Sequence, residues 1–272
     1  MSVSVALLQL EVSSAESPDA RVARVLNLIP EAAANAEFLV LPELWHVGAF
    51  DLDAIRTHAQ SIHGPLARQL GAAARAQGVW LHAGSIAERD DSGRLFNTSL
   101  LFAPSGDLIA RYRKIHLFGF ASGESAVMSA GEELVLTQTD LGRTGLSTCY
   151  DLRFPELFRA LGAQGAESVV VTSGWPHSRI EHWRVLVRAR AIENQCWVIA
   201  CNQVGTQNGP DGPVMLGGLS QIVDPLGEVV AQGGAEECLV FGSVDVTSVR
   251  EVRDSFPVLR DIKLTTGFSV AD

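Results

Sequence analysis

Short apolar runs of β-forming residues recur along the whole chain, whereas helical periodicity occurs only early and late. The predicted strands are residues 3–10, 37–41, 79–86, 97–103, 108–113, 134–139, 144–149, 168–172, 196–202, 219–223, 228–231 and 239–244. The predicted helices are residues 65–77, 155–164, 180–195 and a first helix that starts after Ser17 and ends before Glu37. This order predicts α/β layers in which helices cover the outer faces of sheet.

No linker, repeat or low-complexity stretch interrupts the 272 residues, so we expect one domain over residues 1–272. The loop richest in turn formers, residues 204–218, holds five of the 25 glycines and two prolines. A chain of this length can bury a sufficient core without a disulfide or a structural metal ion.

Charge and cysteine content narrow the partners and the location. The 21 basic and 31 acidic side chains give a formal charge of -10, which would repel a nucleic acid backbone. No apolar run approaches the roughly 20 residues that span a bilayer, so we expect neither nucleic acid nor membrane as a partner. The four cysteines are too few for a secreted disulfide scaffold, and the N-terminus lacks the basic start of a signal peptide. We therefore expect reduced thiols and a cytoplasmic location.

The usual cofactor motifs do not occur. The sequence contains no phosphate-binding Gly-x-x-x-x-Gly-Lys-Ser/Thr, no Gly-x-Gly-x-x-Gly after a strand, no Cys-x-x-Cys and no His-Glu-x-x-His. Cys196 and Cys201 lie on an apolar strand, where thiols are usually core residues. We expect no metal and no cofactor.

Cys149 stands at a different kind of position, where an apolar strand ends and Tyr150 to Glu156 lead into a helix. A nucleophile at such a junction is accessible and lies near N–H groups of a helix end. A lone cysteine is more often a small core residue, and a thiol nucleophile needs a base or a positive neighbour. Among the seven histidines, His116 or His177 would serve in a papain-like Cys/His pair.

Two charged residues also lie at the ends of predicted buried strands: Glu43, in Leu-Pro-Glu-Leu, and Lys114, in Arg-Lys-Ile-His-Leu-Phe. A buried charge is costly unless it is used, although each residue alone could be a surface charge. With Cys149 they supply a base, a cation and a nucleophile, and Glu43 is the better candidate for the base.

These three motifs, in this order, resemble the nitrilase superfamily of carbon–nitrogen hydrolases, as does Gly-Leu-Ser-Gln-Ile-Val-Asp-Pro-Leu-Gly at residues 218–227. The resemblance implies a four-layer α-β-β-α sandwich in which Glu43, Lys114 and Cys149 meet at one end of the sheets. It also implies a homodimer or higher homo-oligomer, formed across a helical face, with the C-terminal tail, residues 246–272, at the interface. Glu124, followed by Ala-Gly, matches the second glutamate of the family and is expected to position its neighbours and balance their charge.

The resemblance also implies the chemistry. Glu43 takes the thiol proton, Cys149 attacks an amide carbonyl, and Lys114 and the Tyr150 N–H stabilise the oxyanion. Ammonia leaves, and water activated by Glu43 hydrolyses the thioester without a cofactor.

For the substrate, the segment that carries Trp175 and Arg179 resembles bacterial ω-amidases, which hydrolyse 2-oxoglutaramate and related 2-oxo acid amides. Arg179 is the expected clamp for the substrate carboxylate, because arginine binds carboxylates in bidentate fashion. Trp175 and Arg153 are the other expected substrate contacts. Two alternatives stay open: Arg179 could pair with Glu181 on the surface, and Arg153 could orient a helix end through an ion pair.

Other functions remain possible at this point. An N-carbamoyl amidohydrolase is the first alternative, nitrilase activity ranks below it, and a non-catalytic protein that uses the fold as a scaffold is the alternative from another class. The presence of all three catalytic residue types argues against a non-catalytic scaffold.

Overall fold

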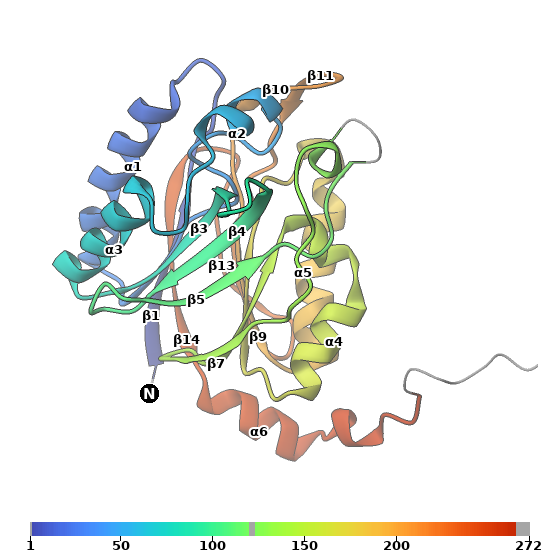
Figure 1. Cartoon of the computed structure of the whole chain (residues 1–272). Helices are drawn as coiled ribbons and strands as arrows, with labels where there is room; N and C mark the ends of the chain where they lie inside the picture. Colours follow the sequence, from blue (N-terminus) through green and yellow to red (C-terminus); the bar gives the residue numbers. More distant parts are fainter. Residues whose placement is uncertain (1, 120–122, 265–272) are drawn as a thin grey trace, which may run out of the picture.

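The computed structural model describes residues 2–119 and 123–264, and it contains two six-stranded sheets packed face to face (Figure 1). The first sheet has the order β14 (Cys238–Asp245), β1 (Ser2–Gln9), β2 (Phe38–Val40), β3 (Trp80–Arg89), β4 (Leu95–Phe102) and β5 (Leu108–Arg113). The second has the order β13 (Val229–Gln232), β12 (Gln221–Val223), β9 (Trp197–Cys201), β8 (Ser168–Thr172), β7 (Gly142–Thr148) and β6 (Leu136–Thr139).

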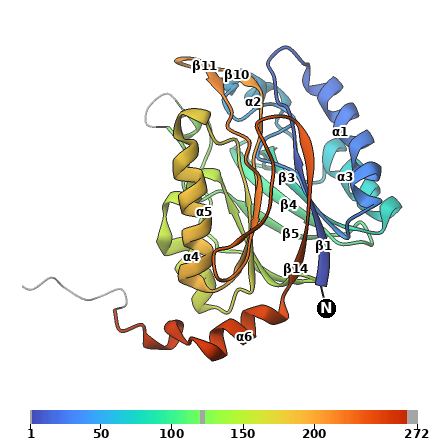
Figure 2. The same ribbon diagram turned by 180° about the vertical axis from the view of Figure 1, so that it is seen from behind.

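Helices cover the outer face of each sheet. The first sheet is covered by α1 (Pro18–Ala33) and α3 (Pro65–Gln77), and the second by α4 (Pro155–Ala163) and α5 (Ile180–Asn194). The two pairs lie on opposite sides of the molecule in Figures 1 and 2. The predicted α-β-β-α sandwich of a single domain is therefore confirmed.

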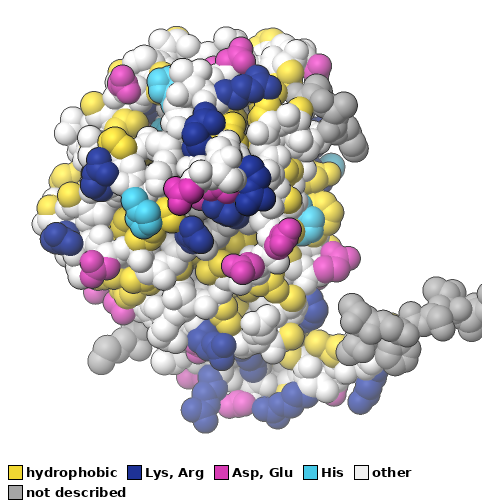
Figure 3. All heavy atoms as spheres, viewed as in Figure 1, with side chains coloured by type: hydrophobic (Ala, Val, Ile, Leu, Met, Phe, Trp, Pro, Cys, Tyr) yellow, Lys and Arg dark blue, Asp and Glu magenta, His cyan; other side chains and the backbone are white. Residues whose placement is uncertain are grey.

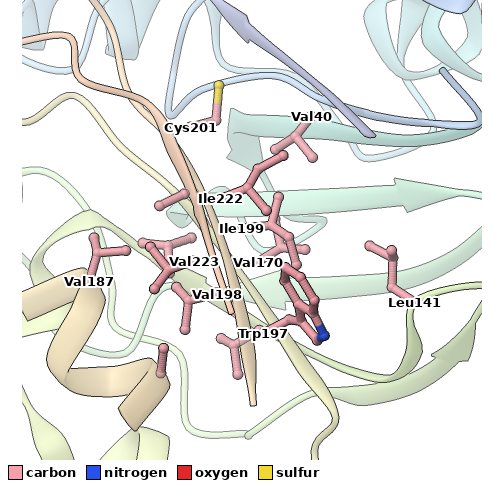
Figure 4. Close-up of a cluster of buried hydrophobic side chains, with 14 of the residues drawn as sticks. Val40, Leu141, Val170, Val187, Trp197, Val198, Ile199, Cys201, Ile222 and Val223 are labelled. Carbon is pink, nitrogen blue, oxygen red and sulfur yellow. The ribbon is translucent and has the colours of Figure 1, made fainter. Parts of the chain in front are cut away.

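Strand alternation creates the layers. In β1, Val5 and Leu7 point into the space between the sheets, whereas Ala6 and Leu8 point toward the helices. Figure 4 shows the layer between the sheets, where side chains of the second sheet approach Val40 of the first. Burial of these apolar side chains drives the two sheets together.

The strand directions place functional residues at one edge. β1, β2 and β3 run parallel in the first sheet, and β7, β8 and β9 run parallel in the second. At one edge of the first sheet β1 also pairs along its whole length with β14, which is antiparallel to it. Glu43, which follows β2, and Cys149, which follows β7, line the same pocket, so the carboxyl ends of the two sets of parallel strands lie at the same end of the sandwich.

Two strands and two helices lie where the sequence predicted no regular element. The loop expected at residues 204–218 contains the hairpin β10 (Thr206–Gly209) and β11 (Gly212–Met215), whose side chains are largely exposed. The helices α2 (Leu52–His58) and α6 (Thr247–Ser255) span seven and nine residues, and each fully buries a single side chain, so their apolar faces are short. Short 3₁₀ segments complete the structure: η1 (Glu124–Ala126), η2 (Cys149–Arg153), η3 (His177–Arg179) and η4 (Val258–Asp261).

Several expectations about partners can be compared with the described residues. Within residues 2–119 and 123–264, no helix is both long and apolar enough to cross a bilayer. In the same ranges, no three His, Cys, Asp or Glu side chains are grouped so that they could hold a metal ion. Basic and acidic side chains are interspersed on the face in Figure 3.

Cys196 and Cys201 are core thiols as predicted, but Cys238 is only half-buried because it lies on the edge strand β14.

Candidate active site

The four residues predicted to act together meet in one pocket of about 990 Å³. Glu43, Lys114, Glu124 and Cys149 all line it, and their exposed fractions are 2%, 1%, 5% and 8%. Three ionisable side chains and a thiol at such depth are expensive to bury, so they must satisfy one another.

The turn after β2 presents Glu43. Leu44 has a left-handed backbone (φ 42°), which reverses the chain directly after the glutamate. Gly84 lets this turn pass, because a Cβ there would lie 1.9 Å from the Pro42 carbonyl oxygen. The turn is also held from α1, where the buried Arg21 guanidinium donates to the carbonyl oxygens of Trp45 and His46, at 3.3 and 3.2 Å.

Lys114 extends directly from β5 and binds both carboxylates. Its Nζ lies 2.7 Å from Oε1 of Glu43 and 2.8 Å from Oε2 of Glu124. Glu124 comes from η1, and its Oε2 also accepts the Phe118 N–H at 2.9 Å. The expected role of Glu124 as a partner of the lysine therefore has a geometric basis.

Burial and charge set the protonation states. Burial alone would lower the pKa of Lys114, but the carboxylates of Glu124 and Glu43 hold that pKa well above its ordinary value. Burial raises the pKa of Glu124, and the Lys114 ammonium opposes the rise. Lys114 is thus a permanent ammonium, suited to an electrostatic role and unsuited to that of a base.

Cys149 begins η2 directly after β7 and has a left-handed backbone (φ 47°). A non-glycine residue in this region is strained, and such strain is typical of nucleophiles at a strand-to-helix turn. The next N–H, that of Tyr150, belongs to the first turn of η2, where N–H groups have no acceptor within the helix. That N–H is thus available to an oxyanion.

The thiol itself is protonated at neutral pH. Burial and the negative charge of Glu43 raise the pKa of Cys149, while the Lys114 charge and the nearby Ser173 hydroxyl lower it. The raising effects prevail, so the thiol needs a base at the moment of attack.

Asp151 ties the nucleophile turn to the lysine segment. Its Oδ2 accepts the Thr148 N–H at 2.9 Å and the Tyr112 hydroxyl at 2.7 Å. Its Oδ1 accepts the His116 N–H at 3.0 Å and lies 2.8 Å from His116 Nδ1. The His116 ring also stacks on Phe154, at 3.7 Å between centroids, and is therefore engaged with Asp151 and Phe154.

His177, the other histidine considered for a papain-like pair, lines the pocket but is exposed at its rim. The buried neighbours of the thiol are instead Glu43, Lys114 and Ser173. This arrangement favours the carboxylate over an imidazole as the base.

The pocket rim carries two arginines arranged around Trp175. The Arg153 guanidinium lies 4.6 Å from the centre of the Trp175 ring, and the Trp175 indole N–H donates to the Arg179 carbonyl oxygen at 2.8 Å. Burial and the nearby Arg179 charge lower the pKa of Arg153. Tyr150, the remaining predicted contact, also lines the pocket.

Neither arginine makes the ion pair considered from the sequence. Glu181 pairs with Arg184 at 3.2 Å, and Arg153 contacts His182 Nδ1 at 3.2 Å. Within residues 2–119 and 123–264, neither Arg153 nor Arg179 has a carboxylate partner in a salt bridge. Two cations are thus exposed to the pocket.

Three site residues escaped sequence reasoning: Asn97, Ser173 and Asp151. Asn97 and Ser173 adjoin or belong to apolar strand runs and so look like ordinary sheet positions. Asp151 lies two residues after the nucleophile, and its acidity within a buried motif was the one available signal.

Comparisons with known proteins show the family of this chain and its relatives. The model of the carbon-nitrogen hydrolase family matches residues 4–254. A 2-oxoglutaramate amidase of Paenarthrobacter nicotinovorans is 44% identical over 94% of this chain and 88% of its own length. A 2-oxoglutaramate amidase of Bacillus subtilis is 37% identical over 97% of this chain and 98% of its own. The crystal structure of Saccharomyces cerevisiae Nit3, of the nitrilase superfamily, superimposes with a TM-score of 0.84 at 30% identity, covering 94% of this chain and 95% of that one.

Proposed function

This chain belongs to the carbon-nitrogen hydrolase family, and we propose that it is an ω-amidase that releases ammonia from a small 2-oxo acid amide through a thioester on Cys149. That it is an amide-hydrolysing enzyme follows from the family and from its amidase relatives. The 2-oxo acid substrate is the finer proposal, and one observation on this chain carries it: the unpaired arginines at the pocket rim.

The electrostatics explain why the arginines matter. Deep in the pocket, the carboxylates of Glu43 and Glu124 face a single ammonium, that of Lys114, so this cluster repels an anion. A substrate that carries a carboxylate must therefore find positive charge elsewhere in the pocket. Arg153 and Arg179 supply it, and guanidinium groups bind carboxylates strongly when partly desolvated.

In the proposed first half-reaction, Glu43 takes the proton of the Cys149 thiol as the sulfur attacks the amide carbonyl carbon. The oxyanion of the tetrahedral intermediate is stabilised by the Lys114 ammonium and the Tyr150 N–H. The carbon–nitrogen bond then breaks, and Glu43 passes its proton to the nitrogen, which leaves as ammonia. Glu124 keeps Lys114 charged and in place.

In the second half-reaction, Glu43 takes a proton from water, whose oxygen attacks the thioester carbonyl. The carbon–sulfur bond breaks and Glu43 returns the proton to the sulfur, which restores the thiol. One carboxyl group therefore acts alternately as base and acid. The products are ammonia and a 2-oxo dicarboxylate.

A substrate panel tests the proposal. We expect ammonia release to be fastest with 2-oxoglutaramate and 2-oxosuccinamate, and slower by orders of magnitude with N-carbamoyl amino acids and simple nitriles. Cys149→Ala is the matched inactive control. A carbamoyl compound or nitrile that outperformed the oxo acid amides would overturn the substrate assignment while leaving the nucleophile in place. If the Cys149→Ala variant kept the full biological effect of the unaltered chain, the protein would instead be a non-catalytic scaffold.

We also infer that the chain forms a homodimer or higher homo-oligomer and acts in the cytoplasm. Val185 and Ile192, seven residues apart on α5, are 64% and 49% exposed, and the tail adds Phe256 at 67%. Apolar side chains so exposed on one helix face support an interface between copies. Of the tail, residues 265–272 lie outside the described residues.

All four cysteines are free, as a reducing compartment requires. Sedimentation equilibrium and localisation of a tagged chain test these inferences.

A further inference from the structure

Asn97, on β4, contacts both carboxylates of the site and the backbone of Lys114. Its side-chain Nδ2 donates to Oε1 of Glu43 at 2.8 Å and to Oε1 of Glu124 at 2.6 Å. Its backbone carbonyl oxygen accepts the Lys114 N–H at 2.9 Å. With the two bonds from the Lys114 ammonium, the Asn97 amide completes a closed ring of hydrogen bonds that runs through both carboxylates.

The orientation of the Asn97 amide follows from this ring. If the amide were reversed, its oxygen would face two carboxylates, which would be strongly unfavourable. In the observed orientation, Oδ1 has no hydrogen-bond partner within the described parts of the chain, although the residue is fully buried. An apolar side chain of the same size would avoid this unpaired oxygen. The unpaired oxygen is a local cost of the asparagine, and such costs are typical of residues retained for function.

The ring also distinguishes the two oxygens of Glu43. Oε1 accepts two hydrogen bonds, from the Lys114 ammonium and from Asn97, whereas Oε2 accepts one, from the Gly174 N–H at 2.9 Å. A proton on Oε1 would displace one of its donors, one of which is a cation. Oε2 is thus the oxygen that can take a proton.

We propose that Asn97 is a positioning residue that directs the Cys149 proton to Oε2 of Glu43 and keeps Glu43 and Glu124 ionised side by side. Its two N–H donors add to the single ammonium of Lys114, which alone leaves the pair of carboxylates with a net negative charge. This role rests on the reaction at Cys149, but not on the identity of the amide.

The test replaces the amide with an apolar group of similar size. In N97L both donors disappear, while the backbone bond to Lys114 remains. We expect kcat to fall about 10- to 100-fold, the effect of losing a hydrogen bond to a charged group, with little change in KM. We also expect the acid limb of the kcat/KM profile to move up by about one pH unit, because the ionised carboxylates lose a donor.

T98V is the matched control. The neighbouring Thr98 hydroxyl donates to the buried carboxylate of Glu88, which lies outside the pocket, and valine has the same shape. Like N97L, T98V removes from β4 a buried donor to a carboxylate, so it reproduces any loss of stability that comes from removing such a bond. We expect its acid limb to stay in place. An equal shift in T98V and N97L would overturn the proposal.

Two further measurements keep the outcome decisive. If N97L does not fold, N97S, which is smaller and cannot bridge both carboxylates, is judged by the same two readouts. Infrared titration of the buried carboxyl groups follows their protonation without any substrate, and we expect the transition to move up in the variant. The infrared titration needs no turnover of any amide in the panel. A failure of the proposed function can therefore be distinguished from a failure of the proposed role of Asn97. A folded variant with unchanged kcat, acid limb and infrared titration would refute the role of Asn97.

Discussion

The Gly174 N–H lies 2.9 Å from Oε2 of Glu43, so a residue that follows β8 in the second sheet holds the carboxylate that follows β2 in the first. This bond fixes the base relative to Cys149, which follows the adjacent strand β7. The base and the nucleophile thus come from different sheets, and their separation depends on how the sheets pack.

Replacing Glu43 should separate thiol acidity from catalysis. In Glu43→Gln we expect turnover to fall by about 10³-fold, the usual contribution of a general base. The pKa of Cys149 should nevertheless move down, because the negative charge of Glu43 is one of the causes that raise it, while Lys114 remains. Ultraviolet absorbance of the thiolate, measured against Cys149→Ala, reports this pKa. A higher thiol pKa in the variant would contradict the proposed electrostatics.

Removing the rim arginines should affect charged substrates selectively. In Arg153→Met and Arg179→Met we expect kcat/KM for 2-oxoglutaramate to fall about 10- to 100-fold, as expected for a lost charge-assisted hydrogen bond. A neutral amide of similar length should lose far less. Arg184→Met is the control, because Arg184 pairs with Glu181 outside the pocket. Equal losses with the charged and the neutral amide would show that the arginines are structural.

Asp151 should prove important for both stability and activity. Asp151→Asn replaces an acceptor of several hydrogen bonds, so we expect a loss of about 2–4 kcal/mol in the free energy of unfolding and a lower kcat. Tyr112→Phe removes only one of these bonds and should cost about 1 kcal/mol. Urea unfolding measures both variants. If Asp151→Asn were no more harmful than Tyr112→Phe, the remaining bonds of Asp151 would have little weight.

Two buried histidines should make the fold sensitive to acid. Burial lowers the pKa of His46 and of His82 from 6.5 to about 3, so both stay neutral in the folded chain. Below pH 6.5 the unfolded chain binds protons that the folded chain does not. Stability should therefore fall toward acid pH by about 1.4 kcal/mol per pH unit for each histidine.

The slope of stability against pH tests this directly. In urea unfolding between pH 4 and 6, the slope of the unfolding free energy against pH should be smaller in His82→Leu by about 1.4 kcal/mol per pH unit, the contribution of one proton. Leu81→Val, beside His82 on β3, removes no titratable group and should leave the slope unchanged. An unaltered slope in His82→Leu would mean that this imidazole is not the source of the acid sensitivity.

Much of the fold could be predicted, because its signals are local. The helix α3 and the strands β5 and β8 have the bounds that the sequence predicted, since each combines a strong apolar pattern with clear ends such as Gly78. The helices α2 and α6 were not predicted, because they span only seven and nine residues and each fully buries one side chain, so their apolar faces are too short to distinguish from a loop. The hairpin β10–β11 was hidden among glycines and prolines that are equally typical of a loop.

The site residues could be predicted from the sequence only where a charged side chain stands next to a predicted buried strand. Glu43 and Lys114 were noticeable because charged residues followed buried strands. Asn97 raised no such conflict, since an asparagine at a strand end is ordinary, and its importance depends on pairing between β4 and segments far away in sequence. The partners of Arg153 were equally beyond reach, because Trp175 comes from another strand end.

The pairing of β1 with β14 has a consequence for synthesis. On the ribosome, β1 emerges long before its antiparallel partner, and the two pair from Ser2 with Asp245 to Gln9 with Cys238. Until β14 has been translated, the nascent chain holds an apolar strand with one open edge, which invites pairing with other chains. All the residues between Gln9 and Cys238 must therefore be translated before that edge closes, and chaperones that bind nascent chains have access to β1 throughout that time.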